Sequence, residues 1–169
     1  MRTRRHAYFS SGGFEFNPVI SVNTADYNVA TAATAAGWDG VKPLIATITI
    51  NSGVVVYGSL TTPGAAAFTV PSLPTGSIVN IIRNGSIIGR GGASGAGGGG
   101  TPGSAVGQAG GTGYDGLLLS YPVTLYGTGM IAGGGGAGGG GEGITIDSPN
   151  GQYSSAGGGG GNGAGAGVS

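Results

Sequence analysis

Residues 89–100 read Gly-Arg-Gly-Gly-Ala-Ser-Gly-Ala-Gly-Gly-Gly-Gly, and two further glycine tracts follow at 133–143 and 157–167. The chain holds 43 glycines in 169 residues, and most of them lie after Asn84. Glycine loses more backbone freedom on ordering than any other residue. The tracts are therefore either disordered or held by main-chain hydrogen bonds that only a backbone without Cβ atoms can make.

The spacing of the larger residues in the first tract favours order. When residues 89–100 are divided in threes, one face is entirely glycine, and Arg90, Ala93 and Ala96 share another face. A polyproline II backbone has three residues per turn and rises about 3.1 Å per residue, so each tract could be a polyglycine II helix about 35 Å long, packed on its neighbours. The expected packing glycines are Gly92, Gly95, Gly98, Gly135, Gly136, Gly139, Gly159 and Gly160.

Other glycine-rich structures were weighed against packed helices. Flexible linkers remain open, because Gly-rich segments commonly form coils. Collagen needs long Gly-X-Y runs with proline, which the tracts lack. The turns and loops between the tracts disfavour a silk-like aggregate.

An internal repeat links the tracts to strands. The segments Val79-Asn-Ile81 and Gly85-Ser-Ile87-Ile88 recur 44 residues later as Val123-Thr-Leu125 and Gly129-Met-Ile131-Ala132. Each copy predicts a strand, a turn, a short apolar strand and then a glycine tract, and a weaker third copy begins at Ile144. Units repeated in this way stack on one another, because one unit alone cannot bury its apolar face.

The first half of the chain predicts a small β domain. One helix is expected at 25–36, capped by Asn23 or Thr24 and ended by Gly37. Strands are expected at 44–51, 54–57, 66–70, 78–83 and 87–88, with a hairpin-type turn at Asn84-Gly85. The aromatic residues expected to serve the core or an attachment surface are Trp38, Phe14 and Phe16.

Together these features predict a mostly β fold with one short N-terminal helix, in which β-repeat units are followed by packed polyglycine II helices. The expected regions are an irregular N-terminal arm at 1–24, a helix-plus-strands attachment or oligomerisation domain at 25–88, and a glycine-rich region at 89–169.

The composition argues against several classes of function. Charged residues are 7% of the chain, its net charge is zero, and Arg90 is the last basic residue, so the glycine half cannot neutralise phosphates of nucleic acid. There is no cysteine, and His6 is the only histidine, which makes a catalytic triad implausible. Glu142 and Asp147 could be imagined as a glycosidase pair, but exposed loop carboxylates are far commoner. We therefore expect no enzyme, no metal site and no cofactor.

The N-terminus also predicts how the protein is targeted. The basic start Met-Arg-Thr-Arg-Arg-His is followed by Tyr-Phe-Ser-Ser-Gly-Gly and not by an apolar segment, so no signal peptide is expected. No apolar run approaches membrane-spanning length, and insertion into a membrane is not expected.

The run from Asn84 to Gly92, Asn-Gly-Ser-Ile-Ile-Gly-Arg-Gly-Gly, followed by alternating tracts and loops, resembles the glycine-rich receptor-binding modules of bacteriophage tail fibres and tail tips. The T-even-like tail fibre tip adhesins are of this type, and the resemblance covers roughly residues 20–169. It implies packed polyglycine II motifs and loops that contact the bacterial surface. This chain has about three tracts, fewer than the T-even adhesins carry, which suggests that copies associate.

The resemblance implies a structural protein of the virion tail tip or tail fibre, made in the host cytoplasm. Its expected partners are other tail or fibre proteins and a bacterial outer-surface receptor, either protein or polysaccharide. A homotrimer is the simplest assembly, and a monomer capping a trimeric fibre is the alternative. Two other classes of protein remain open. One is an ice-binding or cell-surface structural protein with flat glycine faces, and the other is a disordered surface protein.

The receptor-binding surface is expected in two inserts between the tracts, 101–120 and 142–155, because loops on a rigid scaffold commonly carry binding. Tyrosine offers a large contact area at a low cost in conformational entropy. Leu117–Leu119 could equally begin a buried strand. The candidate residues are Gln108, Tyr114, Asp115, Leu117, Leu118, Asp147, Asn150, Gln152 and Tyr153.

Overall fold

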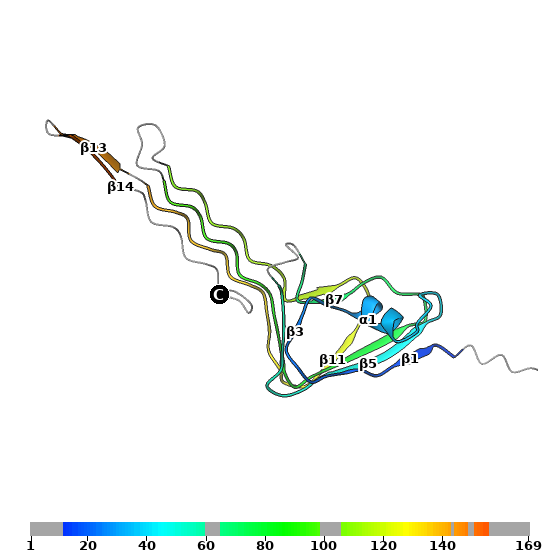
Figure 1. The fold of residues 1–169 in the computed structure, drawn as a ribbon. Helices are drawn as coiled ribbons and strands as arrows, with labels where there is room; N and C mark the ends of the chain where they lie inside the picture. The colour runs from blue at the N-terminus through cyan, green and yellow to red at the C-terminus, as the bar shows by residue number, and fades with distance from the viewer. Residues whose placement is uncertain (1–11, 60–64, 99–105, 143, 149–150, 156–169) are drawn as a thin grey trace, which may run out of the picture.

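The computed structural model describes residues 12–59, 65–98, 106–142, 144–148 and 151–155. The strands in these ranges form three parallel sheets and one antiparallel pair (Figure 1). Sheet A holds β1 (Phe14–Phe16), β2 (Val19–Ile20), β5 (Leu44–Ile50), β8 (Ile78–Arg83) and β11 (Thr124–Tyr126). Sheet B holds β3 (Thr24–Ala25), β6 (Val55–Tyr57), β9 (Ser86–Ile88) and β12 (Ile131–Ala132), and sheet C holds β4 (Tyr27–Asn28), β7 (Phe68–Val70) and β10 (Leu117–Leu119).

The chain visits sheets A, B and C in turn and then returns to sheet A, so the three sheets wind around one core as a parallel β-solenoid. Within the described residues the first coil is β1–β4, the second is β5–β7, the third is β8–β10 and the last, incomplete coil is β11–β12. A short helix, α1 (Val29–Ala35), contacts β4 and β7. The prediction of a mostly β protein with one short helix is confirmed.

The core forms because each coil turns one set of alternate side chains inward. Along β5, buried and half-buried residues alternate without interruption, as expected for a strand with one face on a core. Equivalent inward residues then stack from coil to coil: Ile48 pairs in register with Ile81, and both are fully buried. Parallel stacking of this kind makes one continuous core out of strands of only a few residues.

The 44-residue repeat predicted from the sequence is confirmed as the register between the third and the last coils. Asn80 pairs with Thr124 in sheet A, and Ile87 pairs with Ile131 in sheet B. The repeated units therefore stack in parallel, each coil covering the apolar face of the previous one.

The hairpin predicted at Asn84-Gly85 is wrong, because β8 and β9 belong to different sheets. The amides of both residues donate to the Ile50 carbonyl, which turns the chain through the corner between sheets A and B. A Cβ on Gly85 would lie less than 3.0 Å from the carbonyl oxygen of Val54. Glycine is required here because the stacked corners approach closely, not because a two-residue hairpin needs it.

The weaker third copy of the repeat, predicted from Ile144, is also wrong. Strand β13 (Ile144–Ser148) pairs antiparallel with β14 (Gly151–Ser155) and not with the solenoid (Figure 1). Strand β13 therefore has the next strand of its own hairpin as its pairing partner, and it adds no strand to the solenoid.

The helix is shorter than predicted and begins later. The side chain of Asn28 accepts a hydrogen bond from the Thr31 amide, so Asn28 is the N-cap in place of Asn23 or Thr24. The first residues of the predicted helix instead form β3 and β4, and Asp26 makes the corner between them with a φ of 48°. Pairing with the second coil overrides the local helix preference. The stop at Gly37 is confirmed, with a φ of 102°.

The N-terminal region is less irregular than expected. Two strands, β1 and β2, lie within residues 12–24, β3 begins at Thr24, and all three pair with the second coil. Phe16 and Trp38 are buried in the core, Phe14 packs against it, and the Trp38 indole donates to the Lys42 carbonyl at 2.9 Å. These aromatic residues therefore belong to the solenoid.

Tyr27 provides a test of the core. Its ring centroid lies 5.1 Å from that of Phe68, and its hydroxyl is buried without a hydrogen-bond partner among the described residues. Burial raises the pKa of Tyr27 to about 12. The native state therefore holds the phenol proton more tightly than the unfolded chain, so the stability that depends on the neutral phenol is present below about pH 10 and is lost as the pH rises through about 12.

We expect Tyr27→Phe to be at least as stable as the parent chain at pH 7, because it removes a buried hydroxyl that makes no hydrogen bond. It should also lose part of the alkaline destabilisation, a difference of at most about 3 kcal/mol for a two-unit pKa shift. Urea unfolding at pH 7 and pH 11 measures both effects. Tyr126→Phe, at a site 52% exposed, is the control. Identical pH dependence for Tyr27→Phe and the parent chain would contradict this account.

Candidate functional site

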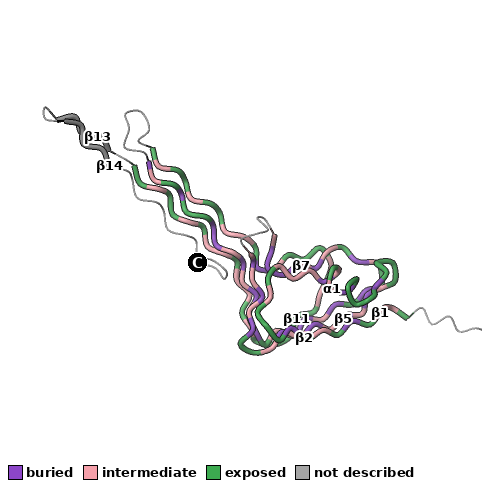
Figure 2. The backbone as a smooth tube through the Cα atoms, viewed as in Figure 1, coloured by how far each residue is buried: buried purple, intermediate pink, exposed green. Residues whose placement is uncertain are grey.

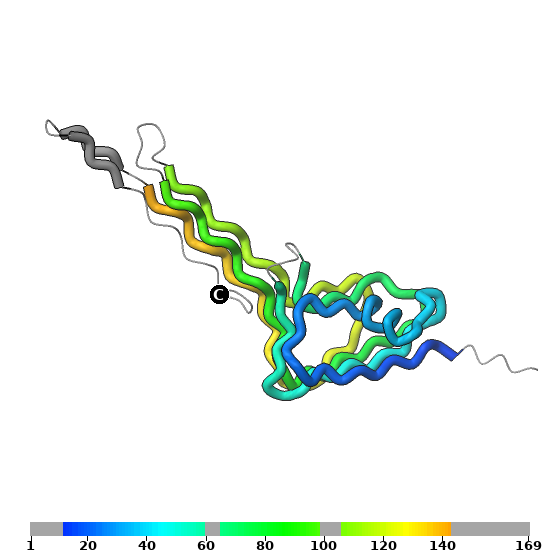
Figure 3. Tube along the Cα trace, in the orientation of Figure 1, coloured from blue at the N-terminus to red at the C-terminus, as the bar shows by residue number. Residues whose placement is uncertain are grey.

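Three extended segments run side by side and project from the solenoid (Figures 1 and 3). Segment 1 is residues 89–98 and follows β9, segment 2 is residues 106–116 and leads into β10, and segment 3 is residues 133–142 and follows β12. They leave the body together between sheets B and C, and we call them the glycine arm.

Main-chain hydrogen bonds join the segments at every third residue. From segment 1, the amides of Gly89, Gly92, Gly95 and Gly98 donate to the carbonyls of Ala132, Gly135, Gly138 and Gly141 at 2.8–3.1 Å. From segment 2, the amides of Gln108, Gly111 and Tyr114 donate to the carbonyls of Ala96, Ala93 and Arg90 at 2.8–2.9 Å. From segment 3, the amides of Gly134, Ala137 and Gly140 donate to the carbonyls of Tyr114, Gly111 and Gln108 at 2.7–2.9 Å.

The three sets of bonds close a ring. Segment 1 donates to segment 3, segment 3 donates to segment 2, and segment 2 donates to segment 1. The residue pairing shows that segments 1 and 3 run in the same direction and that segment 2 runs opposite to both. Backbone amides and carbonyls of the arm thus find their hydrogen-bond partners in neighbouring segments of the same chain.

The ring requires glycine on its inner faces. A Cβ on Gly113 would lie less than 3.0 Å from the Gly134 carbonyl oxygen, and one on Gly92 would lie equally close to that of Gly111. The same conflict arises at Gly89, Gly95, Gly107, Gly110, Gly116, Gly134 and Gly140. Exposed residues alternate over short distances with buried ones along segment 1 and mainly with half-buried ones along segments 2 and 3 (Figure 2). The backbones are therefore in contact with one another, and the larger side chains are directed outward.

The predicted packing glycines do not all occupy such positions. Gly92 and Gly95 face backbone on the ring interior, Gly98 is buried, and Gly135 accepts from the Gly92 amide. At Gly136 and Gly139 a Cβ would find its nearest neighbour at 3.8 Å and 3.5 Å, which is ordinary contact. Gly159 and Gly160 lie outside the described residues.

The root of the arm is anchored to sheet C. The amides of Ala67 and Phe68 donate to the carbonyls of Asp115 and Gly116 at 3.1 Å and 2.9 Å. Beside this junction the Arg90 guanidinium lies over the Tyr114 ring, 5.3 Å from its centroid. A cation on an aromatic face is attractive, so this pair ties segment 1 to segment 2 through side chains as well.

The insert predicted as a loop at 101–120 is mostly regular structure. Residues 106–116 form segment 2, and Leu117–Leu119 form β10, while residues 101–105 lie outside the described part of the chain. Gln108 and Asp115 are exposed on segment 2, and Tyr114 is half-buried against Arg90. The glycines of segment 2 occur at every third position (107, 110, 113 and 116), a spacing in the sequence that would have revealed a third packed segment.

The remaining candidates are spread over the solenoid and the hairpin. Leu117 packs against the core, and Leu118 is exposed on β10. Asp147 pairs in register with Gln152, and Ile146 with Tyr153, across β13 and β14. Asn150 lies outside the described residues. The structure thus places Gln108, Tyr114 and Asp115 on one segment and Asp147, Gln152 and Tyr153 on one hairpin.

Among the described residues no group of three or more His, Asp or Glu side chains could hold a metal ion. No helix in that part of the chain is long and apolar enough to cross a membrane.

Comparison with known proteins identifies a family to which this chain is similar. A family model described as "Phage tail fibre adhesin Gp38" matches residues 15–169, which include all of the solenoid except its first residue, Phe14, and the whole glycine arm. No curated protein and no solved structure matches the chain.

Proposed function

The chain belongs to the phage tail fibre adhesin Gp38 family, and on that premise we propose that its glycine arm is a rigid support that holds receptor-binding residues away from the tail. Membership of an adhesin family places the protein in the virion tail, where it binds a host receptor and other tail components. The role of an adhesin is attachment to a host cell. Family membership therefore favours a structural phage protein over the ice-binding alternative. The arm is the observation that carries the proposal, because rigid backbone packing can fix the position of exposed side chains at its surface.

We infer that the three segments are polyglycine II helices of the T-even-like adhesin type. Their hydrogen bonds recur every third residue and run between segments, which agrees with a helix of three residues per turn that has no internal hydrogen bonds. The requirement for glycine on the interior supports the same assignment.

We propose that the receptor surface lies along segment 2 and on the β13–β14 hairpin, which follows the far end of segment 3 in the chain. The residues proposed to contact the receptor are Gln108, Tyr114, Asp115, Asp147, Asn150, Gln152 and Tyr153. Leu117 and Leu118 belong to β10, and we assign them to the solenoid.

The hydrogen bonds that join the three segments also bear on how many copies of the chain associate. The homotrimer expected from the sequence rested on glycine faces left unfilled within one chain. In the structure the three segments satisfy one another within one chain. We therefore propose one copy at each fibre end, the alternative arrangement, and light scattering of the purified chain at micromolar concentration distinguishes a monomer from a trimer.

The double variant Tyr114→Ala with Tyr153→Ala tests the receptor surface. We expect the variant to fold, because the main-chain amide and carbonyl of Tyr114, and not its side chain, make the hydrogen bonds of the ring. Binding of the purified chain to susceptible bacteria should fall more than about tenfold, since truncating an aromatic hot spot commonly costs about 2 kcal/mol or more.

Flow cytometry of bacteria incubated with labelled protein measures this binding. Tyr126→Ala, at a site 52% exposed on β11 of the solenoid, is the matched control and should bind as the parent chain does. Unchanged binding by the folded double variant would move the receptor surface away from both tyrosines. Failure of the parent chain to bind any susceptible strain would contradict the adhesin function itself.

A further inference from the structure

All three segments of the glycine arm continue directly into strands of the solenoid. Segment 1 follows β9, segment 3 follows β12, and segment 2 leads into β10. In sheet B the last strand pair is Ile88 with Ala132, and the bond from the Gly89 amide to the Ala132 carbonyl is already the first bond of the arm. No residue separates strand from segment, so segments 1 and 3 keep the register in which β9 and β12 pair.

The hydrogen bonds of the arm do not fix a register by themselves. They recur at every third residue, so a slip of three residues gives each amide an equivalent carbonyl and loses one of the four bonds between segments 1 and 3. Side chains mark the register only weakly, because residues 133–141 are all glycine except Ala137. A slip would move the far end of segment 3 by about 9 Å, which is three residues at about 3.1 Å each.

The strand pair at the junction does not accept the same slip. Side chains of a strand alternate between two faces, so a shift by an odd number of residues turns the inward side chains outward. Ile87 is fully buried, and Ile131, its partner in register, packs against the core. The strands therefore accept shifts of two residues and the segments accept shifts of three. The smallest shift that suits both is about six residues, more than half of segment 3.

Arg83 opposes a shift of any length. It is the last residue of β8, and its guanidinium donates to the carbonyls of Gly127 and Gly129, in the turn before β12. The Arg83 carbonyl accepts in return from the Gly129 amide at 2.8 Å. A Cβ on Gly127 would lie less than 3.0 Å from that carbonyl oxygen, so the backbones are in contact. Arg83 therefore fixes where β12 begins against the previous coil.

We propose that the β9–β12 pair and Arg83 form a register lock for the glycine arm, which makes Ile131 and Arg83 positioning residues for the surface that the arm presents. The lock works because a two-residue period is joined without slack to a three-residue period. With such a lock, a long ladder of glycines needs no side-chain mark of its own. The proposal concerns the arm itself, and it holds whichever molecule the arm binds.

Distances between two spin labels measure the register directly. The chain has no cysteine, so Val41→Cys in the solenoid and Gly139→Cys on segment 3 each take one nitroxide label. Val41 is 77% exposed, and a Cβ fits both at Gly139 and at Gly136, whose place the label would take after a slip. Ala137→Gly is added to remove the one methyl mark, and this labelled chain is the reference.

We expect double electron–electron resonance to show one distance in the reference chain, because the lock alone is enough to set the register. Several distances in the reference chain would assign the register to Ala137 and overturn the lock.

Arg83→Gln with Ile131→Gly removes the lock from the reference chain. The guanidinium bonds are lost, and glycine has no side chain to turn outward. We expect a second population of at least about 10% of the molecules, with the distance shifted by up to about 9 Å. Ile131→Val in place of Ile131→Gly should restore one distance, because valine again has a side chain that must face the core. A single unchanged distance in the folded unlocked variant would overturn the proposal.

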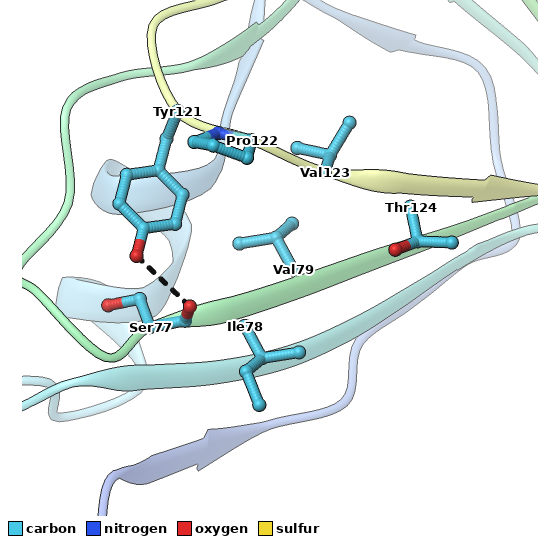
Figure 4. A pocket seen from close by; sticks show the side chains of 7 residues that line it. All are labelled: Ser77, Ile78, Val79, Tyr121, Pro122, Val123 and Thr124. Carbon is cyan, nitrogen blue, oxygen red and sulfur yellow. Dashed lines mark hydrogen bonds between the residues drawn. The ribbon is translucent and has the colours of Figure 1, made fainter.

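Val123→Gly in the reference chain is the matched control. Val123 is half-buried in the same coil and, with Val79, lines a pocket of about 220 Å³ (Figure 4). The Tyr121 hydroxyl donates to the Ser77 carbonyl at 3.0 Å and ties this stretch to the previous coil (Figure 4). The control removes a branched apolar side chain but leaves β12 and Arg83 unchanged, so we expect one distance. Two distances here would reflect general loosening of the coil, and the lock would be wrong.

An insertion tests the lock without touching the core. Three glycines placed between Ala132 and Gly133 keep the ladder in phase, so the label on segment 3 should move outward by about 9 Å as one population. If the far end of the arm set the register, the inserted residues would bulge at the junction and the distance would stay the same, which overturns the proposal. Bacteria take no part in these measurements, so the adhesin function stands or falls separately.

Discussion

Replacing Gly113 with alanine is expected to separate the three glycine segments and to reduce binding of the purified chain to bacteria by at least about tenfold. A Cβ at this position would lie less than 3.0 Å from the backbone carbonyl of Gly134, and neither backbone can move without breaking the bonds of the ring. Overpacking a well-packed interior costs about 1–3 kcal/mol or more, and about 1.4 kcal/mol corresponds to a factor of ten.

Amide hydrogen exchange shows whether the ring is lost. In the parent chain the amides of Gly134, Ala137 and Gly140 donate to segment 2 and should exchange slowly. In Gly113→Ala all three should exchange quickly, while the amides of β5 stay protected because the solenoid core is untouched.

Gly136→Ala is the matched control for this substitution. The same methyl group on segment 3 would find its nearest neighbour, the Gly111 carbonyl oxygen, at 3.8 Å. This variant should therefore keep its slow amides and its binding. Equal exchange rates in the two variants would show that the segments are not in backbone contact, and fast exchange throughout the parent arm would contradict the packed ring.

Replacing Phe68 with alanine is expected to lower the free energy of unfolding by about 3–5 kcal/mol, the usual cost of deleting a buried phenylalanine side chain. Phe68 is fully buried in the middle strand of sheet C, between Tyr27 and Leu117 in register, and its amide holds the root of the arm through Gly116. The substitution leaves a cavity between three coils, so their stacking is weakened together.

Urea unfolding followed by circular dichroism measures the effect, and the loss is large compared with the total stability of a small domain. Leu118→Ala is the control, since Leu118 is 45% exposed on the adjacent strand β10. We expect Leu118→Ala to lower the free energy of unfolding by much less than Phe68→Ala does. Comparable losses in the two variants would mean that sheet C does not share the solenoid core.

The candidate site could be predicted only in part, and the glycines show why. The sequence indicates that glycine is required and that the period is three, because no other residue type lets backbones meet. It does not indicate which of the three faces is turned inward, so Gly136 and Gly139 were expected to pack although a Cβ fits at both. The inward face depends on where the neighbouring segments lie.

Segment 2 was predicted to be a loop, although it is one of the three packed segments. Its larger residues, among them Gln108 and Tyr114, are typical of a recognition loop and led to the prediction of an insert at 101–120. Its amides and carbonyls are nevertheless part of the ring, because glycine at every third position leaves the two other faces free to carry side chains. A packed segment and a binding surface are therefore compatible in one stretch of chain.

From the sequence alone, the long alternating strand and the 44-residue repeat could be predicted, and the glycine tracts were limited to two states, disorder or backbone packing. Alternating β-branched residues select β5, a 44-residue shift aligns β8 with β11, and the glycine tracts exclude a core of side chains in the arm. All of these are local or periodic properties, which a linear pattern records directly.

The tertiary structure alone decided how these pieces pair. Asn84-Gly85 suits a hairpin locally, yet the chain turns a solenoid corner there, because parallel stacking on the second coil buries Ile81 and Ile87 completely. The same stacking shortens the helix to Val29–Ala35 and leaves Leu119 and Leu125 uncovered at one end. Burial of apolar area between distant segments outweighs local preference, and a linear pattern does not record which segments meet.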